Sequence, residues 1–355
     1  MAVRSELLMR LQIEQPIIQA GMAGGVTTPE LVAGVTKAGG LGTIGAGYMT
    51  AESLRSTVQL VKKQTSGSFA VNLFVPETPE VVAEDVQAAN EKLSLIHKEL
   101  KLAAQSMPDK LPSFFEEQLE IIIEEEITVC SFTFGIPPAP HIERLKAHGV
   151  FLIGTATTVE EAVQNEQAGM DAVVAQGSEA GGHRGTFAES FEKAMVGTMA
   201  LVPQVVDEVD IPVIAAGGIM DGRGILAAHA LGAGAVQMGT AFLTSSESGA
   251  PQAHQQAVLM SKETETAVTS IFSGKPARGI TNKMMIQLEA LGHNWPPYPI
   301  QNTLTQPIRK EAARQNESAF MSLWSGQGTR LSVREPTGVM IKRLMQEAEE
   351  AWESL

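Results

Sequence analysis

A histidine and an arginine, His183 and Arg184, lie in a loop, residues 177–185, that also holds four glycines. The apolar run 172–175 and the polar Gln176 before it predict that this loop follows the carboxyl end of a strand. Glycines lack a Cβ, so their backbone can pass close to a bound group, and a histidine can take up a proton near neutral pH. The pattern predicts a catalytic base on a strand-end loop; a surface turn with a solvated histidine is the alternative.

Two more glycine turns lie one strand-and-helix unit apart further along the chain. One apolar run ends in Gly217 and Gly218, and the next ends in Gly239 and Thr240. In a barrel of parallel strands, the last two such turns often bind a phosphate through backbone N–H groups and a helix N-terminus. The spacing therefore predicts a phosphate-bearing ligand, and simple tight turns are the alternative.

Two polar residues interrupt apolar strand patterns. Asn72 lies within the run 69–73, and Gln176 ends the run that begins at Ala172. A buried amide needs a hydrogen-bond partner, which could be either the edge of a bound ring or a protein group. The small-residue loop 20–25 would suit the face of a flat aromatic ring, with ordinary turn chemistry as the alternative.

Other motifs point away from dinucleotide and metal sites. Residues 40–45 match G-x-G-x-x-G, but they follow a helical pattern and themselves contain a strand pattern, which is the wrong context for a dinucleotide. No H-E-x-x-H or similar ligand spacing occurs, so we expect no catalytic metal. The single cysteine, Cys130, excludes an internal disulfide and a cysteine-rich metal site.

Short apolar runs alternate with longer helical patterns along the chain. Eight strands are predicted, at residues 17–20, 41–44, 69–73, 128–132, 150–154, 172–176, 212–216 and 235–239. Helices are predicted at residues 29–38, 51–64, 139–147, 159–168, 198–208 and 223–231. The count of eight predicts an α/β fold, a (β/α)₈ TIM barrel, which needs about 250 residues. An open doubly wound sheet is the alternative.

The chain is longer than such a barrel requires, and the excess falls in two places. Residues 76–126 are polar and charged and predict a helical insertion after the third strand. Residues 263–355 form a C-terminal extension, which we expect on the substrate side, and it ends in an amphipathic helix at 340–352. We expect the barrel, the insertion and the extension to form a single domain, residues 1–355.

Charge and hydropathy exclude several classes of partner. The 40 acidic and 26 basic residues give a formal net charge of −14, which repels nucleic acids and anionic membranes. Residues 1–18 lack the apolar core of a signal peptide. No run of about 18 apolar residues could span a bilayer. We therefore expect a cytoplasmic protein with a small-molecule substrate.

Taken together, these motifs resemble the nitronate monooxygenase family, formerly called 2-nitropropane dioxygenase, in its class I type. The segments that carry the resemblance are residues 16–25, 132–135, 177–185, 212–224 and 237–242. The similarity runs from about residue 11 to residue 340. It implies a single TIM-barrel domain with non-covalent FMN. It also implies oxidation of alkyl nitronates by O₂, giving a carbonyl compound and nitrite.

The resemblance also implies roles for particular residues. His183 would be the catalytic histidine beside the substrate. The implied cofactor-binding residues are Asn72, Gln176 and Gly181 at the flavin, and Gly218, Gln237, Met238, Gly239 and Thr240 at its ribityl phosphate. Many relatives have a second histidine where this chain has Thr133, so its substrate preference could differ.

Several alternatives stay open at this point. His183 could act as a base on a neutral nitroalkane or, when protonated, could hold the nitro oxygens. A flavin-dependent enoyl-acyl-carrier-protein reductase, which uses NAD(P)H, has a very similar loop to 177–185. A flavin- or sugar-phosphate-binding regulatory protein without turnover is a third possibility. The sequence indicates neither the physiological nitronate nor the oligomeric state.

Overall fold

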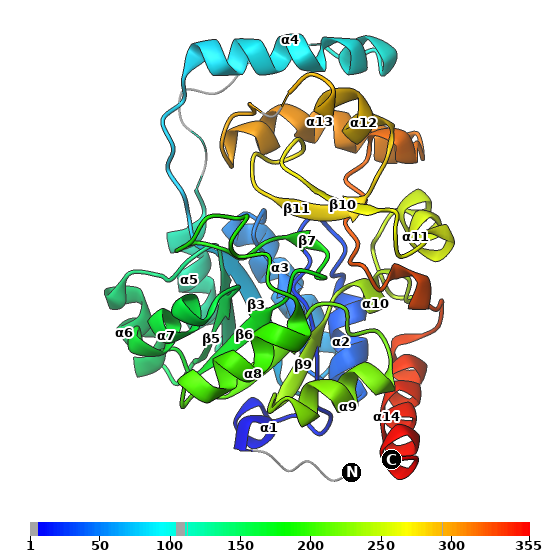
Figure 1. Ribbon diagram of the computed structural model, residues 1–355. Coiled ribbons are helices and arrows are strands. Elements are labelled where there is room, and N and C mark those ends of the chain that lie inside the picture. Colours follow the sequence, from blue (N-terminus) through cyan, green and yellow to red (C-terminus); the bar gives the residue numbers. More distant parts are fainter. Residues whose placement is uncertain (1–5, 104–110, 112, 293) are drawn as a thin grey trace.

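Eight parallel strands form a barrel at the centre of the molecule (Figure 1). The computed structural model describes residues 6–103, 111, 113–292 and 294–355. The barrel strands are β1 Ile17–Gln19, β2 Gly42–Gly45, β3 Phe69–Phe74, β4 Val129–Thr133, β5 Phe151–Ala156, β6 Ala172–Gln176, β8 Val213–Ala216 and β9 Ala235–Met238. Each lies within two residues of its predicted bounds.

The sheet closes on itself. Its strands are ordered β1-β9-β8-β6-β5-β4-β3-β2, and a parallel bridge between Ile18 and Leu41 joins the two ends. This confirms the barrel and excludes the open doubly wound sheet. Buried apolar residues cover both faces of the strands, which is why the strand sequences read as continuous Val, Ile and Ala runs.

Helices surround the barrel in the places that the capping residues predict. The six predicted helices are α2 Pro29–Lys37, α3 Ala51–Gln64, α6 Ala139–Ala147, α7 Val159–Gln167, α8 Thr198–Glu208 and α9 Gly222–Ala230. The Thr28 side chain accepts a hydrogen bond from the backbone of Leu31, and Thr158 does the same for Glu161. Each such cap stabilises its helix by about 1 kcal/mol.

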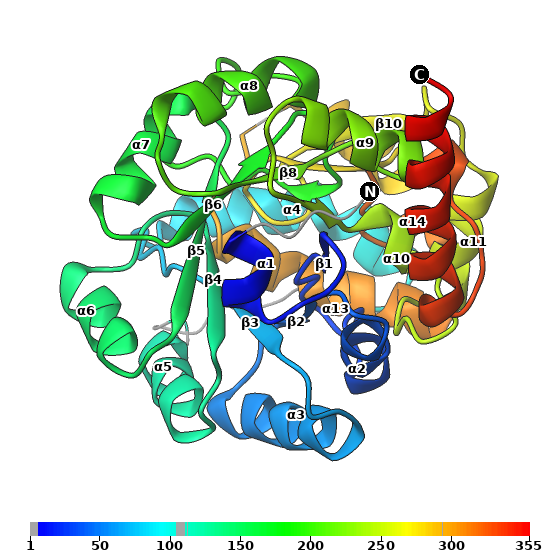
Figure 2. The same cartoon turned by 90° about the horizontal axis from the view of Figure 1, so that it is seen from below.

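The amino-terminal end of the barrel is covered by a short helix, α1 Glu6–Leu11 (Figure 2). Leu7, Leu8 and Leu11 are buried against the inward-facing strand residues, among them Ile18 and Ile214. This packing closes one end of the barrel to ligands. A functional site must therefore lie at the carboxyl ends of the strands, as in other barrels.

The insertion contains two helices with different partners. Helix α5 Phe115–Glu124 packs on the barrel through Phe115, Leu119 and Ile122. Helix α4 Ala83–Glu99 lies away from the barrel, at the top of Figure 1, and packs against α12 Lys283–Glu289 and α13 Ile300–Arg314. Within the predicted insertion 76–126, residues 104–110 and 112 lie outside the described residues.

After β9 and the short helix α10 Thr240–Leu243, the chain leaves the barrel and forms a cap, residues 244–336, over the carboxyl ends of the strands (Figure 1). The cap contains α11 Gln252–Met260, α12, α13, and the 3₁₀ helices η1 Ser318–Phe320 and η2 Thr329–Leu331. Its strands β10 Thr266–Thr269 and β11 Ala277–Ile280 pair with β7 Gly182–His183 in an antiparallel sheet. The sequence pattern did not predict β7, which lies inside the glycine-rich loop.

The last helix, α14 Thr337–Glu353, returns to the barrel and takes the place of its eighth outer helix. It packs against α9 on one side and α2 on the other (Figure 2). Its buried residues Met340, Ile341, Leu344 and Ala348 join the core between strands and helices. Gly222 permits this approach, since a Cβ there would lie 2.2 Å from the backbone nitrogen of Ala348.

The docking of α14 can be tested by truncating its central apolar residue. Leu344 is 0% exposed, so Leu344→Ala should lower the free energy of unfolding by about 2–5 kcal/mol through lost contacts and a cavity. The control Lys342→Ala, on the exposed face of the same helix, should change it by less than about 0.5 kcal/mol. Urea titrations would measure both, and equal losses would show that α14 is not packed as described.

Candidate active site

Backbone pairing on one side and a side-chain amide on the other hold His183 in place. In strand β7, Gly182 and His183 pair with Arg278 and Ala277 of β11. Gln176, at the carboxyl end of β6, donates from Nε2 to the carbonyl of His183 at 3.1 Å. Its Oε1 accepts from the backbone N–H of Gly185 at 2.9 Å. The loop is therefore tied both to the barrel and to the cap.

The imidazole of His183 is half-buried among aromatic rings of the cap and of the loop after β4. Ring centroids lie 5.5 Å away for Phe134, 5.4 Å for Trp324 and 6.3 Å for Tyr298. The Nε2 atom lies 2.8 Å from the hydroxyl oxygen of Ser273. These contacts restrict the ring to one orientation at the carboxyl end of the barrel.

Two cations adjoin this imidazole. Burial, followed by the charges of Arg309 and Lys275, lowers the pKa of His183 from 6.5 to about 3. Lys275 pairs with Glu77 and lies over the ring of Phe134. Arg309 donates to the backbone and side chain of Asn302, and no carboxylate among the described residues pairs with it. This lowered pKa favours the neutral imidazole near neutral pH.

Arg184, the neighbour of His183, has its side chain buried within the protein. It is 1% exposed and donates to the carbonyl oxygens of Gly177 at 2.5 Å, Gln176 at 3.0 Å and Ala194 at 3.1 Å. Burial lowers its pKa to about 10, so it stays protonated at neutral pH. Arg184 thus holds the backbone of the loop rather than a ligand.

The predicted phosphate turns come together around a segment of the cap that the sequence did not indicate, residues 325–328. The backbone N–H of Gly326 donates to the Thr240 hydroxyl at 2.9 Å, and a Cβ on Gly181 would lie 2.5 Å from the same nitrogen. Ser325 has a buried hydroxyl with no partner among the described residues. The only signal in the sequence was the pair of glycines in this segment, on either side of Gln327.

The turn after β8 has the backbone shape expected of a close approach. Gly217 and Gly218 have φ values of +114° and +73°, which residues with side chains rarely adopt. On β9, Gln237 is paired in register with Ile18 and Ala216, whereas Met238 is buried in the core between strands and helices. Met238 can therefore offer only its backbone to a ligand.

Asn72 has protein partners. Its side-chain NH₂ group donates to the hydroxyls of Ser131 at 3.0 Å and Thr133 at 3.1 Å. Thr133 therefore helps to orient this amide. The Oδ1 atom of Asn72 has no hydrogen-bond partner among the described residues. A flavin contact by Asn72, and by the other residues named for it, stays a prediction.

Residues 40–45 pack as expected from their strand pattern. Gly42 and Gly45 lie on β2, and a Cβ on Gly42 would lie 2.2 Å from the carbonyl oxygen of Val32 on α2. A Cβ on Gly45 would lie 2.5 Å from the carbonyl carbon of Met22. These glycines allow close contact between barrel layers and do not form a nucleotide loop.

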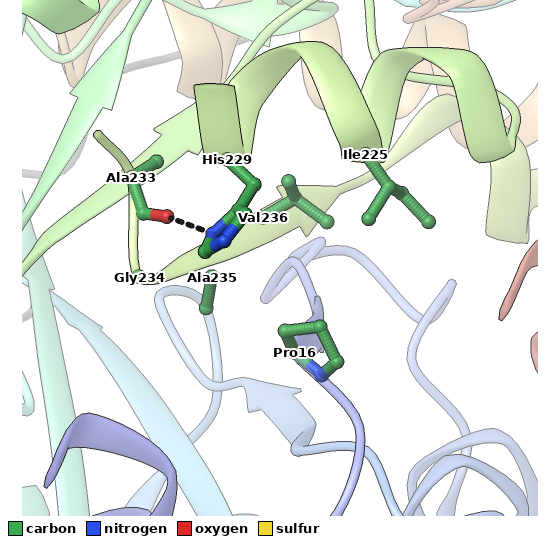
Figure 3. A pocket seen from close by; sticks show the side chains of 7 residues that line it. All are labelled: Pro16, Ile225, His229, Ala233, Gly234, Ala235 and Val236. Atoms are coloured by element: carbon green, nitrogen blue, oxygen red, sulfur yellow. Dashed lines mark hydrogen bonds between the residues drawn. The ribbon is translucent and has the colours of Figure 1, made fainter. Parts of the chain in front are cut away.

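A small cavity of about 10 Å³ lies near the other end of the barrel (Figure 3). It is lined by seven residues, including Pro16, His229 and Ala235. Its volume is close to that of a single water molecule. The Nδ1 atom of His229 lies 3.4 Å from the carbonyl oxygen of Ala233. His229 thus has a structural partner, and this cavity is too small for a substrate.

Within the described ranges, no three His, Cys, Asp or Glu side chains gather as a metal site would require. In that same part of the chain, no helix has both the length and the apolarity needed to cross a bilayer.

Comparisons with known proteins agree on one family. A sequence model described as nitronate monooxygenase matches residues 5–347. A probable nitronate monooxygenase from Staphylococcus haemolyticus is 51% identical over 345 residues, which cover 97% of this chain and 96% of that protein.

Two solved structures show how far the likeness extends. A nitroalkane oxidase from Streptomyces ansochromogenes superposes with a TM-score of 0.93 at 39% identity and covers 99% of both chains. FabK from Thermotoga maritima superposes with a TM-score of 0.79 at 31% identity, covering 99% of this chain and 98% of that one. The resemblance noted in the motifs is therefore confirmed over nearly the whole length, and the chain belongs to the nitronate monooxygenase family.

Proposed function

We propose that this protein binds FMN and uses O₂ to oxidise alkyl nitronates to carbonyl compounds and nitrite. One observation carries the proposal: His183 lies where strand β6 ends, and burial together with the charges of Arg309 and Lys275 lowers its pKa. A nitronate is a small anion, so this local positive charge would attract it although the whole chain is acidic. The family and the printed names of the relatives support the same substrate class.

The residues around the phosphate turns fit FMN. Gly181, Gly218 and Thr240 lie beside the cap segment 325–328, and the positive φ values of Gly217 and Gly218 suit backbone that passes close to a phosphate. Backbone N–H groups in such turns bind anions. When bound, FMN would supply the electron-transfer chemistry between the nitronate and O₂.

The protein's own part is to bind, orient and, for a neutral nitroalkane, to remove a proton. The lowered pKa of His183 disfavours a protonated anchor at neutral pH, which leaves the base of the two roles left open by the sequence. Proton removal breaks a C–H bond next to the nitro group and leaves the electron pair on the nitro oxygens. Lys275 and Arg309 would stabilise that negative charge.

Removing the imidazole tests the proposal. The purified protein should be yellow, carry FMN, and consume O₂ when a nitronate is added. His183→Ala should retain FMN but lower turnover of a neutral nitroalkane by about 10²–10⁴-fold, because the base is lost. His229→Ala, which removes a histidine far from the site, is the matched control. A colourless wild-type protein that takes up no FMN would exclude the proposal, and a His183→Ala apoprotein would make His183 structural.

An enoyl-acyl-carrier-protein reductase is the competing function, because that group of enzymes has a loop very similar to residues 177–185. An anaerobic titration separates the two. We expect the flavin to be reduced by a nitronate and to be reoxidised by air. We expect NADH with a crotonyl thioester to give no turnover. Rapid NADH oxidation with the thioester, and no bleaching by nitronates, would favour the reductase.

The protonation of His183 can be measured directly. Its imidazole should stay neutral from about pH 8 down to about pH 5, because burial and two cations oppose the charge. The folded pKa lies below 6.5, so this group's contribution to stability is present above pH 6.5 and is lost as the pH falls toward about 3. An NMR titration, with the His183 signal identified from the His183→Gln spectrum, checks this. A midpoint near 6.5 would contradict it.

A further inference from the structure

Ser273, in the turn before β11, contacts the catalytic candidate directly. Its side chain is 1% exposed, and its hydroxyl oxygen lies 2.8 Å from Nε2 of His183. The same hydroxyl donates to the carbonyl oxygen of Lys275 at 3.1 Å and accepts from the backbone N–H of Lys275 at 3.3 Å.

The number of hydrogen bonds that the Ser273 hydroxyl can donate and accept indicates which nitrogen of the imidazole carries the hydrogen. A serine hydroxyl has one proton and two lone pairs. The proton and one lone pair are used by Lys275, so only a lone pair is left to face Nε2. When both bonds to Lys275 are kept, Nε2 carries the hydrogen of the neutral ring, whereas a hydroxyl that donated to Nε2 would leave the carbonyl of Lys275 without its donor. The lone pair of the ring is then on Nδ1 of His183.

Nδ1 is the atom that remains accessible to a ligand. Among the described residues, none hydrogen-bonds to it, and it is not one of the buried unpartnered atoms. Gly182, the preceding residue, has nothing within 4 Å of where a Cβ would be, so the backbone beside the ring also borders open space.

Two hydrogen bonds and one close backbone approach fix the turn that contains Ser273. The side chain of Gln301 donates to the carbonyl of Ile271 at 2.7 Å, and that of Thr305 donates to the carbonyl of Phe272. Gly274 has a φ of +80°, and a Cβ there would lie 2.2 Å from the carbonyl oxygen of Pro296. The position of Ser273 beside the imidazole is therefore fixed.

We infer that Ser273 is a positioning residue that locks His183 in the tautomer with hydrogen on Nε2 and thereby presents Nδ1 to the substrate as the base. It has this role in catalysis only if His183 is the base of the proposed function. The charged groups that face the ring, Lys275 and Arg309, are both cations and favour the neutral ring without choosing between its tautomers. The hydrogen bond between Nε2 and the Ser273 hydroxyl selects the tautomer.

In the proton transfer to His183, one bond breaks and one bond forms. A C–H bond next to the nitro group of a neutral nitroalkane breaks, its proton goes to Nδ1, and its electron pair moves onto the nitro oxygens. The imidazole becomes positively charged, and its Nε2–H then donates to Ser273 as a charge-assisted hydrogen bond, which is stronger than the neutral one. Ser273 thus supports the product of the step as well as the starting tautomer.

The tautomer can be read by NMR of the FMN-loaded protein labelled with ¹⁵N-histidine. The wild-type His183 signals should show hydrogen on Nε2 and none on Nδ1. Ser273→Ala should give a mixture of tautomers, and Ser273→Thr, which keeps the hydroxyl, should restore the wild-type pattern. Ser261→Ala, which removes a buried cap hydroxyl that bonds Val258 and Thr329 and not the ring, should leave it unchanged. Hydrogen on Nδ1 in the wild type, or no effect of Ser273→Ala, would overturn the inference.

Kinetics gives a second readout. Ser273→Ala should lower kcat with neutral nitroethane about tenfold, the effect of one hydrogen bond, with little change in KM. It should affect the preformed nitronate much less, because that substrate has already lost its proton. Equal losses with both substrates would overturn the positioning role. If the wild type oxidises neither substrate but shows the Ser273-dependent tautomer, the proposed function fails while the structural assignment survives.

Discussion

The site depends on a very short piece of sheet, in which Gly182 and His183 pair with Arg278 and Ala277. This pairing is the point where the loop after β6 joins the cap, and it is reinforced by the hydrogen bond from Arg184 to the carbonyl of Pro276 at 2.9 Å. Without it, the imidazole would belong to a glycine-rich loop with many conformations. With it, the ring is fixed between barrel and cap, and binding a ligand requires little further ordering.

The barrel could be predicted from the sequence because its signals are local. Strands covered on both faces read as short apolar runs, and threonine and glycine at helix ends mark the turns between them. The strand β7 could not be predicted, since Gly182 and His183 have no alternation or β-branched side chains. Its existence depends on pairing with residues about 95 positions later, which no local pattern reveals.

The same limit applies to the site. His183 and the glycine turns were found because their residue types are unusual for their local context. Ser273, Arg309 and Tyr298 reach the imidazole only through the fold of the cap. Arg184 shows the opposite case, because it stands beside His183 in the sequence, yet its guanidinium donates to three backbone carbonyls inside the protein. The direction of a side chain cannot be read from its place in a motif.

Helix α14 completes the outer ring of helices although the entire cap separates it from strand β9. The contacts of α14 with α2 and α9 join residues that are far apart in the sequence, and such contacts form late and slowly during folding. Until α14 arrives, the apolar flanks of α2 and α9 would be open to water. Before α14 docks, these two helices therefore expose an apolar surface. Association of this surface with other chains competes with the docking of α14.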